Sequence, residues 1–230
     1  MNWGRENPVE DVTRYLDNWF NLAIVRTRDF EVLTLVANSA RIPVVNALTD
    51  HNHPCEVLSD LAFIRATRGT LDGLRVVFVG AASNLAHSWF EAAIVLPISV
   101  TQVSPQGFEV DLEWWQGLNT DPRGAVELAD DLQAAVQKAD VIYTDCWPRG
   151  ADPEEEMDIV RSFGPLQVTP DLLDRSPTDT LFLPCPPVTR GQEVSATAMV
   201  HAKCRVYEAK EWLLYAKEAL IYEALVGGPL

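Results

Sequence analysis

The sequence has little of what marks several common classes of protein. It holds no uninterrupted apolar run of about 18 residues, so no membrane-spanning helix is expected. Basic residues are few, with 18 Lys and Arg against 33 Asp and Glu, and the formal net charge is −15. Nucleic acids and anionic membranes attract basic surfaces, so this composition argues against both as partners.

Cysteine is scarce and shows no metal-binding spacing. The four cysteines are widely separated and form no C-x-x-C pair: Cys55, Cys146, Cys185 and Cys204. This usage predicts a cytoplasmic protein with reduced thiols and argues against a structural zinc site. The G-x-G-x-x-G spacing is also absent, so a dinucleotide cofactor is only weakly supported.

What is present is a regular alternation of strand and helix patterns. Short β-branched strands are expected at residues 22–26, 44–47, 75–80, 99–103, 141–145 and 181–184. Helices are expected at residues 7–20, 29–39, 56–67, 85–96, 125–138, 154–163 and 206–226, with an irregular stretch at 105–122. The alternation predicts an α/β fold with a parallel, Rossmann-like sheet covered by helices on both faces.

Polar residues gather where these predicted strands end. Arg26 ends one strand, His53 follows another, and the loops 80–88, 145–150 and 185–190 follow three more. Parallel sheets bind their ligands at the carboxyl ends of the strands. The sequence therefore predicts one binding site built from several of these loops.

The segment from Ile42 to Leu61 is an apolar strand, a polar turn with His53 and Pro54, and a helix. Anions bind at helix N-termini, where free N–H groups point outward. The segment resembles the PVxNALTDxxHPxQxLADL element of the aspartate/ornithine carbamoyltransferases. The resemblance implies that His53 polarises the carbamoyl carbonyl. Glu56 replaces the family's glutamine, and its charge would repel a phosphate dianion unless the carboxylate is protonated or paired.

Two further strands carry the same resemblance. The strand at 23–27 is similar to the family's IxxR strand, which implies that Arg26 contacts carbamoyl phosphate. Residues 80–89 resemble its GDxxNNVxxSL/W loop, which implies that Asn84 contacts the amino-acid substrate and that Ser88 belongs to the same binding loop. On residue type alone, capping of the following helix by Asn84 and Ser88 is the alternative.

Residues 139–147 resemble the family's ADVxYTDVW motif, which implies that Asp145 binds the substrate's α-amino group. A loop-capping aspartate is the alternative. The next residues, Pro148-Arg149-Gly150, differ from the Ser-Met-Gly loop of the ornithine enzymes, so the substrate stays open. Arg149 could bind an acidic or phosphorylated group, or could simply be a solvated loop residue.

Residues 182–194 resemble FxHCLPAxRGxEV, with Pro184 and Pro186 in place of the family's His and Leu. The resemblance implies that Cys185 lies near the attacking amine, that Arg190 belongs to the substrate-binding loop, and that backbone groups hold the carbamoyl group. A buried, inert Cys185 is the alternative.

By the same resemblance, residues 1–67 are a truncated carbamoyl-phosphate-binding α/β domain. Residues 68–205 are the amino-acid-binding domain, and residues 206–230 are a helix that packs back on the first domain. The family's Ser-x-Arg-Thr-Arg loop, which supplies most phosphate contacts, does not occur in the sequence. Each well-placed donor of that kind is worth roughly 3 kcal/mol. We therefore expect a partner chain that carries this loop, and an oligomer, because the family commonly forms trimers with sites between subunits.

Three functions remain. The first is one subunit of a split carbamoyltransferase, which transfers a carbamoyl group from carbamoyl phosphate to an amino-acid-like amine without metal or organic cofactor. The second is a diverged enzyme that acts on an amino-acid-like substrate without carbamoyl phosphate and uses Glu56 as a general base. The third is a non-catalytic homologue. In the terminal helix, the family's substrate-gripping arginine falls near Ala219, so by the resemblance that contact is lost. This change and those at positions 56, 148–149 and 184 favour the second and third functions. The retained Arg26, His53, Asn84, Asp145 and Cys185 argue against the third.

Overall fold

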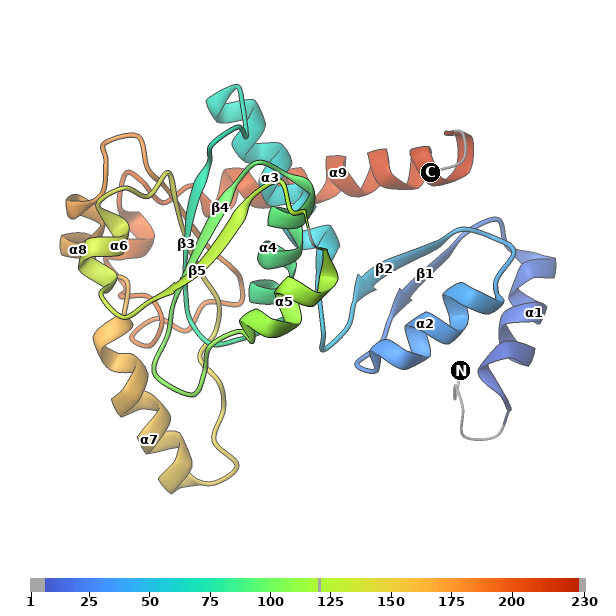
Figure 1. Cartoon of the computed structure of the whole chain (residues 1–230), viewed down its shortest axis with the longest axis horizontal. Helices are drawn as coiled ribbons and strands as arrows, with labels where there is room; N and C mark the ends of the chain where they lie inside the picture. Colours follow the sequence, from blue (N-terminus) through green and yellow to red (C-terminus); the bar gives the residue numbers. More distant parts are fainter. Residues whose placement is uncertain (1–6, 120, 228–230) are drawn as a thin grey trace.

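The computed structural model describes residues 7–119 and 121–227, which form two parallel sheets surrounded by helices (Figure 1). The strands are β1 (Ala23–Arg26), β2 (Val44–Leu48), β3 (Arg75–Val79), β4 (Ser99–Val103), β5 (Ala125–Ala129), β6 (Val141–Thr144) and β7 (Leu181–Pro184). The α-helices are α1 (Val9–Trp19), α2 (Phe30–Ser39), α3 (Pro54–Arg68), α4 (Asn84–Val95), α5 (Leu112–Leu118), α6 (Leu132–Val136), α7 (Pro153–Phe163), α8 (Pro170–Arg175) and α9 (Val206–Val226). Two short 3-10 helices are η1 (Gly164–Leu166) and η2 (Ala198–Val200).

The larger sheet has the strand order β5-β4-β3-β6-β7, and every neighbouring pair is parallel. Its two faces carry alternate residues of the same strands. Val76 and Phe78 of β3 face a core formed with α3 and α4, whereas Val77 and Val79 face a core formed with α6, α7 and α8. The parallel α/β fold expected from the sequence is therefore confirmed.

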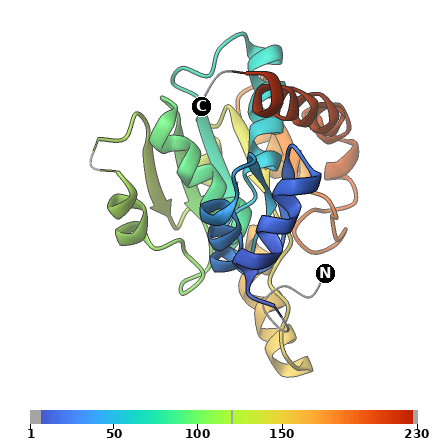
Figure 2. The same cartoon turned by 90° about the vertical axis from the view of Figure 1, so that its right-hand side faces the viewer.

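The smaller sheet consists of β1 and β2, which pair in parallel with an irregular register at Val25 and Arg26. Helices α1 and α2 pack against one another beside it. Figures 1 and 2 show this N-terminal unit on one side of the five-stranded sheet and α9 extending toward that same side. The turn after β2 leads directly into α3, so the two sheets are joined at the residues that include His53.

Helix α3 packs along α9, so the C-terminal helix returns to the segment that joins the two sheets. It begins with Pro54, a residue suited to a first helical turn, and ends at Gly69, whose φ of +85° terminates the helix. Its face toward the larger sheet buries Val57, Leu61 and Ile64. That same helix also buries two carboxylates, Glu56 and Asp60, which need partners in the interior.

The prediction of a single helix at residues 125–138 is wrong. Residues Ala125–Ala129 form the edge strand β5, paired with β4, and a separate short helix α6 follows. Asp131 caps that helix by accepting a hydrogen bond from the Ala134 N–H at 3.0 Å. The apolar spacing fitted a helix, but pairing with β4 determines the structure of the first five residues.

Two other stretches hold more structure than expected. The stretch 105–122 contains α5, and residues 170–175 form α8, neither of which was predicted. Within the described residues, no helix has the length and apolar character needed to cross a bilayer. The predicted domain boundaries remain predictions, and their outermost parts, residues 1–6 and 228–230, lie outside the described residues.

Candidate functional site

The candidate site lies at the carboxyl edge of the five-stranded sheet, beside the turn that follows β2. The strand order reverses between β3 and β6, which is where parallel α/β sheets commonly bind ligands. Gly80 and Asp145 follow these two strands. A Cβ atom on Gly80 would lie 3.9 Å from the Asp145 carbonyl oxygen, so the two loops run close together.

His53 stands at the N-cap of α3 and is held by its backbone. Its N–H donates to Ser88 Oγ at 2.7 Å, and Ser88 Oγ donates to the Asn84 carbonyl oxygen at 2.8 Å. The imidazole is largely buried, with Nε2 lying 3.7 Å from Glu56 Oε2. Its Nδ1 is buried and has no hydrogen-bond partner among the described residues.

Burial lowers the pKa of His53, because a charged imidazole loses its hydration there. The carboxylate of Glu56 acts in the opposite direction and favours the protonated ring, whereas Arg26, Lys217 and Lys210 oppose protonation. The balance keeps His53 neutral near neutral pH. A neutral imidazole can donate one hydrogen bond and accept another.

Glu56 is buried but not uncompensated. Lys210 Nζ of α9 lies 2.8 Å from Glu56 Oε1 and 2.8 Å from both carboxylate oxygens of Asp60. The hydroxyl of Tyr143 on β6 donates to Asp60 Oδ2 at 2.9 Å. From the sequence, the negative charge of Glu56 was expected to repel a phosphate dianion unless it was protonated or paired. In the structure Glu56 is paired with Lys210, a residue that the sequence analysis did not identify.

Cys185 follows β7 and contacts the same carboxylate. Its thiol lies 3.8 Å from Glu56 Oε1 and 3.6 Å from the Pro186 carbonyl oxygen, both within range of a weak S–H donor. Burial raises the pKa of Cys185 well above the value of an ordinary thiol, although Lys210 acts against that rise. Cys185 is therefore a neutral thiol in this site and not an activated thiolate.

Asn84 and Ser88 do not cap α4. Ser83 does so, by accepting a hydrogen bond from the Ala86 N–H at 3.3 Å. Asn84 instead donates to the Thr49 carbonyl oxygen at 2.8 Å, which ties α4 to the turn after β2. The capping alternative for these two residues is thus wrong, while their role as substrate ligands remains a prediction.

Asp145 follows β6 and is partly buried. Its Oδ1 accepts a hydrogen bond from the Cys146 N–H at 2.8 Å. Burial raises the pKa of Asp145, while the Ser83 hydroxyl and the Cys146 N–H favour its charged form. A carboxylate in this setting gains from a cationic ligand, because an ammonium group would offset the loss of hydration.

The three arginines predicted for the site lie on its periphery. Arg26 is exposed at the end of β1 and has no ion pair among the residues that the structure describes. Arg149 is exposed and pairs with Glu156 at 3.2 Å, and Arg190 is exposed in the loop after β7. The structure thus places His53, Glu56 and Cys185 together, with Asp145 close enough to affect the pKa of Cys185.

Sequence reasoning missed Lys210, which pairs with Glu56, and also Asp60 and Tyr143, which share the hydrogen-bond network of that lysine. The position of Asp60 near Glu56 could have been predicted, because it lies four residues later and so shares the same helix face. The position of Lys210 could not, because it lies 150 residues from Asp60 along the chain. No group of three or more His, Cys, Asp or Glu side chains within the described ranges could hold a metal ion.

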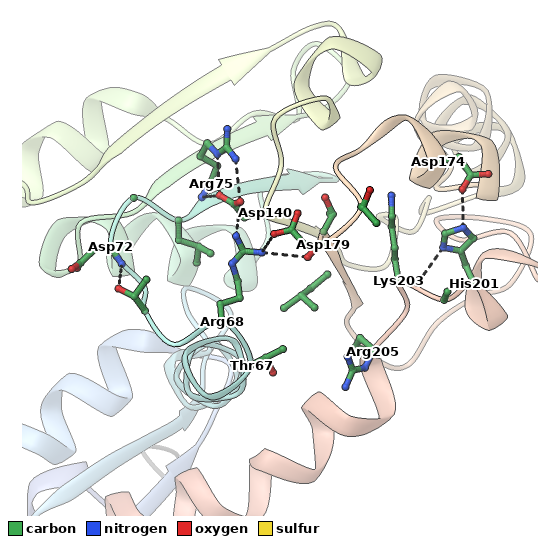
Figure 3. Close-up of a pocket in the computed structure, with 17 residues that line it drawn as sticks. Thr67, Arg68, Asp72, Arg75, Asp140, Asp174, Asp179, His201, Lys203 and Arg205 are labelled. Carbon is green, nitrogen blue, oxygen red and sulfur yellow. Dashed lines mark hydrogen bonds and ion pairs between the residues drawn. The ribbon is translucent and has the colours of Figure 1, made fainter.

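A cavity of about 810 Å³ lies at the opposite, amino edge of the sheet (Figure 3). Arg68 bonds to Asp140 at 2.8 Å and to Asp179 at 3.2 Å. His201 lies 3.2 Å from Asp174. Arg68 and His201 thus already have acidic partners within the chain, so the geometry favours a role in holding segments together over a role in ligand binding.

Comparison with known proteins gives matches over nearly the whole chain. The family model for the aspartate/ornithine carbamoyltransferase Asp/Orn binding domain matches residues 72–224. The model for the carbamoyl-P binding domain of the same family matches residues 1–66.

Individual relatives agree with these models. An ornithine carbamoyltransferase of Chlorobaculum tepidum is 32% identical over 96% of this chain, which spans 66% of the relative's length. One of Acidothermus cellulolyticus is 34% identical over 95% of this chain and 71% of the relative. The structure of the ornithine carbamoyltransferase from Pyrococcus furiosus covers 100% of this chain, with a TM-score of 0.91, 32% identity and 74% of its own chain matched.

Proposed function

The chain belongs to the aspartate/ornithine carbamoyltransferase family, and we propose that it transfers a carbamoyl group from carbamoyl phosphate to the amine of an amino-acid-like substrate. It acts together with a polypeptide segment that supplies the phosphate-binding Ser-x-Arg-Thr-Arg loop. The observation that carries the proposal is the joint placement of His53, Cys185 and Asp145 at one edge of the sheet.

In this reaction the neutral amine attacks the carbamoyl carbon, and the bond from that carbon to the phosphate oxygen breaks. Phosphate leaves with the bonding electron pair, and the amine loses one proton to solvent or phosphate. His53 Nε2 donates a hydrogen bond to the carbonyl oxygen as negative charge develops on it. Asp145 holds the substrate's ammonium group and so orients the attacking amine.

The need for a further segment is supported by the surface of the N-terminal unit. Among the residues that the structure describes, β1 and β2 pair only with one another, so each has one edge without a neighbouring strand. Large apolar side chains of this unit are exposed: Tyr15, Trp19, Phe20 and Ile24. The outer half of α9 exposes another group, Leu214, Tyr215, Tyr222, Leu225 and Val226. Apolar surfaces of this kind mark places where another polypeptide segment packs.

The test is purification of the protein, carrying an affinity tag, from cells that express it naturally. Mass spectrometry identifies any polypeptide that copurifies and any longer form of this chain, and the purified species is assayed with carbamoyl phosphate and ornithine. The proposal predicts that a Ser-x-Arg-Thr-Arg sequence is present in the purified species and that a ureido product forms. Product from the 230-residue chain alone would contradict the need for the segment.

A second function is favoured by one observation, the burial of Glu56 beside His53 and Cys185. Glu56 stands in place of the family's glutamine, and a buried carboxylate beside His53 and Cys185 would suit a general base. This diverged enzyme would act on an amino-acid-like substrate without carbamoyl phosphate. Turnover of an amino acid by the isolated chain, with no carbamoyl phosphate present, would establish it.

Non-catalytic function is the third candidate. It would be established if calorimetry detected no ligand and if His53→Ala and Asp145→Ala both left activity of the complete assembly unchanged. Assembly into an oligomer with sites between subunits is part of our proposal, and the cytoplasmic location remains a prediction from cysteine usage.

A further inference from the structure

Glu56 has two carboxylate oxygens with different surroundings. Oε1 receives Lys210 Nζ at 2.8 Å, the length of a strong charge-assisted hydrogen bond. Oε2 lies 3.7 Å from His53 Nε2, which is too long for a hydrogen bond but close enough for electrostatic attraction. The Glu56 carboxylate is thus hydrogen-bonded to Lys210 and is not hydrogen-bonded to the His53 imidazole.

The two nitrogens of His53 also differ. Nδ1 is buried without a partner among the described residues, so a proton there would leave an unsatisfied buried donor. Nε2 faces the negative charge of Glu56, which favours a proton on that nitrogen. In the neutral ring the proton therefore resides on Nε2, where a ligand oxygen can accept it.

We propose that Lys210 is a positioning residue of the site, which holds Glu56 away from His53 and so keeps the Nε2 proton free for the ligand. Without Lys210, the Glu56 carboxylate would move onto Nε2 and form a direct ion pair. The imidazole would then be protonated, and its donor would be occupied by Glu56. The inference deepens the proposed function, on which it rests, because it explains how a carboxylate can stand at this position.

Charged and polar groups reach His53 from every element around it. Arg26 comes from β1 and Glu56 from α3, while Lys210 and Lys217 come from α9. The hydrogen bond that joins His53 to the Ser88 hydroxyl of α4 is made by the His53 backbone N–H and not by the imidazole. Among these, Lys217 provides a matched control, because it is an exposed lysine on the same helix as Lys210 and makes no ion pair with Glu56 in the described structure.

The experiment is an NMR titration of the imidazole nitrogens in the 230-residue chain without substrate. The chain has four histidines, and the His53 signal is assigned by its loss in His53→Gln. Lys210→Met is expected to raise the pKa of His53 by about one unit and to shift Nε2 toward the imidazolium value. Lys217→Met, which removes the same charge without removing the contact, is expected to give a clearly smaller rise.

Two further variants guard against loss of folding in Lys210→Met, which leaves two buried carboxylates unpaired. Glu56→Gln keeps the Lys210–Asp60 contact and is expected to lower the pKa of His53. Because Lys210 acts through the Glu56 carboxylate, adding Lys210→Met to Glu56→Gln is expected to raise the pKa of His53 no more than Lys217→Met does in the wild-type background. Equal pKa values in the Lys210→Met and Lys217→Met proteins, or no fall in Glu56→Gln, would overturn the inference.

The titration requires no turnover, so its result is independent of whether the chain transfers carbamoyl groups. In an active assembly, a positioning role further predicts that Lys210→Met lowers kcat at neutral pH with little change in the KM for the amino acid. A lysine that only stabilises the fold would lower the amount of active protein and leave the pH profile of kcat unchanged.

Discussion

The Ser88 hydroxyl accepts a hydrogen bond from the backbone N–H of His53 at 2.7 Å. Through this bond α4, which packs on the larger sheet, fixes the N-cap residue of α3. The Asn84 side chain adds a second tie, to the Thr49 carbonyl oxygen at 2.8 Å. The position of the His53 imidazole is thus set by α4 as well as by its own turn.

Ser88→Ala leaves the half-buried backbone N–H of His53 without its acceptor. We expect it to reduce the free energy of unfolding by about 1–3 kcal/mol, measured by urea denaturation. Ser162→Ala is the matched control, because Ser162 makes the same bond to the carbonyl four residues earlier but on an exposed helix. An equal change in the two variants would mean that the bond to His53 contributes nothing.

Gly80→Ala tests the loop at the point where the strand order reverses. Gly80 has a φ of +149°, a conformation that residues with a side chain rarely adopt. We expect a loss of about 1–3 kcal/mol in the free energy of unfolding, because the backbone must shift or remain strained. Gly164→Ala, at a right-handed position with open space around it, is expected to be neutral or slightly stabilising. Similar losses in both variants would contradict this account.

Asp140 makes stability depend on pH at the amino edge of the sheet. Burial opposes its ionisation, but hydrogen bonds from Arg75 and the charge of Arg68 outweigh burial and hold the pKa of Asp140 below its usual value. Asp140→Asn is therefore expected to reduce the free energy of unfolding by about 2 kcal/mol near neutral pH. Because the folded pKa is the lower one, the difference from wild type is complete above about pH 4 and shrinks as pH falls through the folded pKa.

The control for this pH dependence is Asp179→Asn. Asp179 also bonds to Arg68, but its side chain is 73% exposed, so only a few tenths of a kcal/mol are expected from its loss. Urea denaturation at a series of pH values measures both. A constant difference between wild type and Asp140→Asn down to strongly acidic pH would show that the charge of Asp140 is not what stabilises the fold.

Asp145→Asn tests the amino-acid side of the site. We expect it to weaken binding of ornithine by about 10- to 100-fold in calorimetry, since it removes a charge-assisted hydrogen bond to the ammonium group. Asp130→Asn, an exposed acid after β5 at the same edge of the sheet, controls for the general loss of negative charge. Equal weakening by the two variants would assign the effect to net charge.

The sequence was sufficient where a local pattern and the final environment agree. The bounds of β4, β7 and α9 match the predicted ranges, because runs of apolar residues and their periodicity reflect burial directly. The prediction for residues 125–138 was wrong because there the local pattern and the final environment differ. Leu128, Leu132 and Val136 have helical spacing, but hydrogen bonding to β4 makes a strand of the first part, and Asp131 caps the short helix that follows.

The candidate site divides in the same way. His53 and Asp145 were predicted from motifs that lie within short segments of the chain. The charge state around Glu56 was not predictable, since it depends on Lys210, which reaches α3 only when α9 packs along it. The residue type at position 56 showed that a carboxylate there needs a partner, but only the packing of α9 on α3 shows that this partner is Lys210.

The most direct test of our account measures the ureido product formed from isotope-labelled carbamoyl phosphate and ornithine by the assembly purified from its natural host. Wild-type protein, His53→Ala and Asp145→Asn are compared at equal protein concentration. The account predicts product with wild type and at least about a hundredfold less with His53→Ala, because the donor to the developing oxyanion is lost. Undiminished product formation with His53→Ala would contradict it.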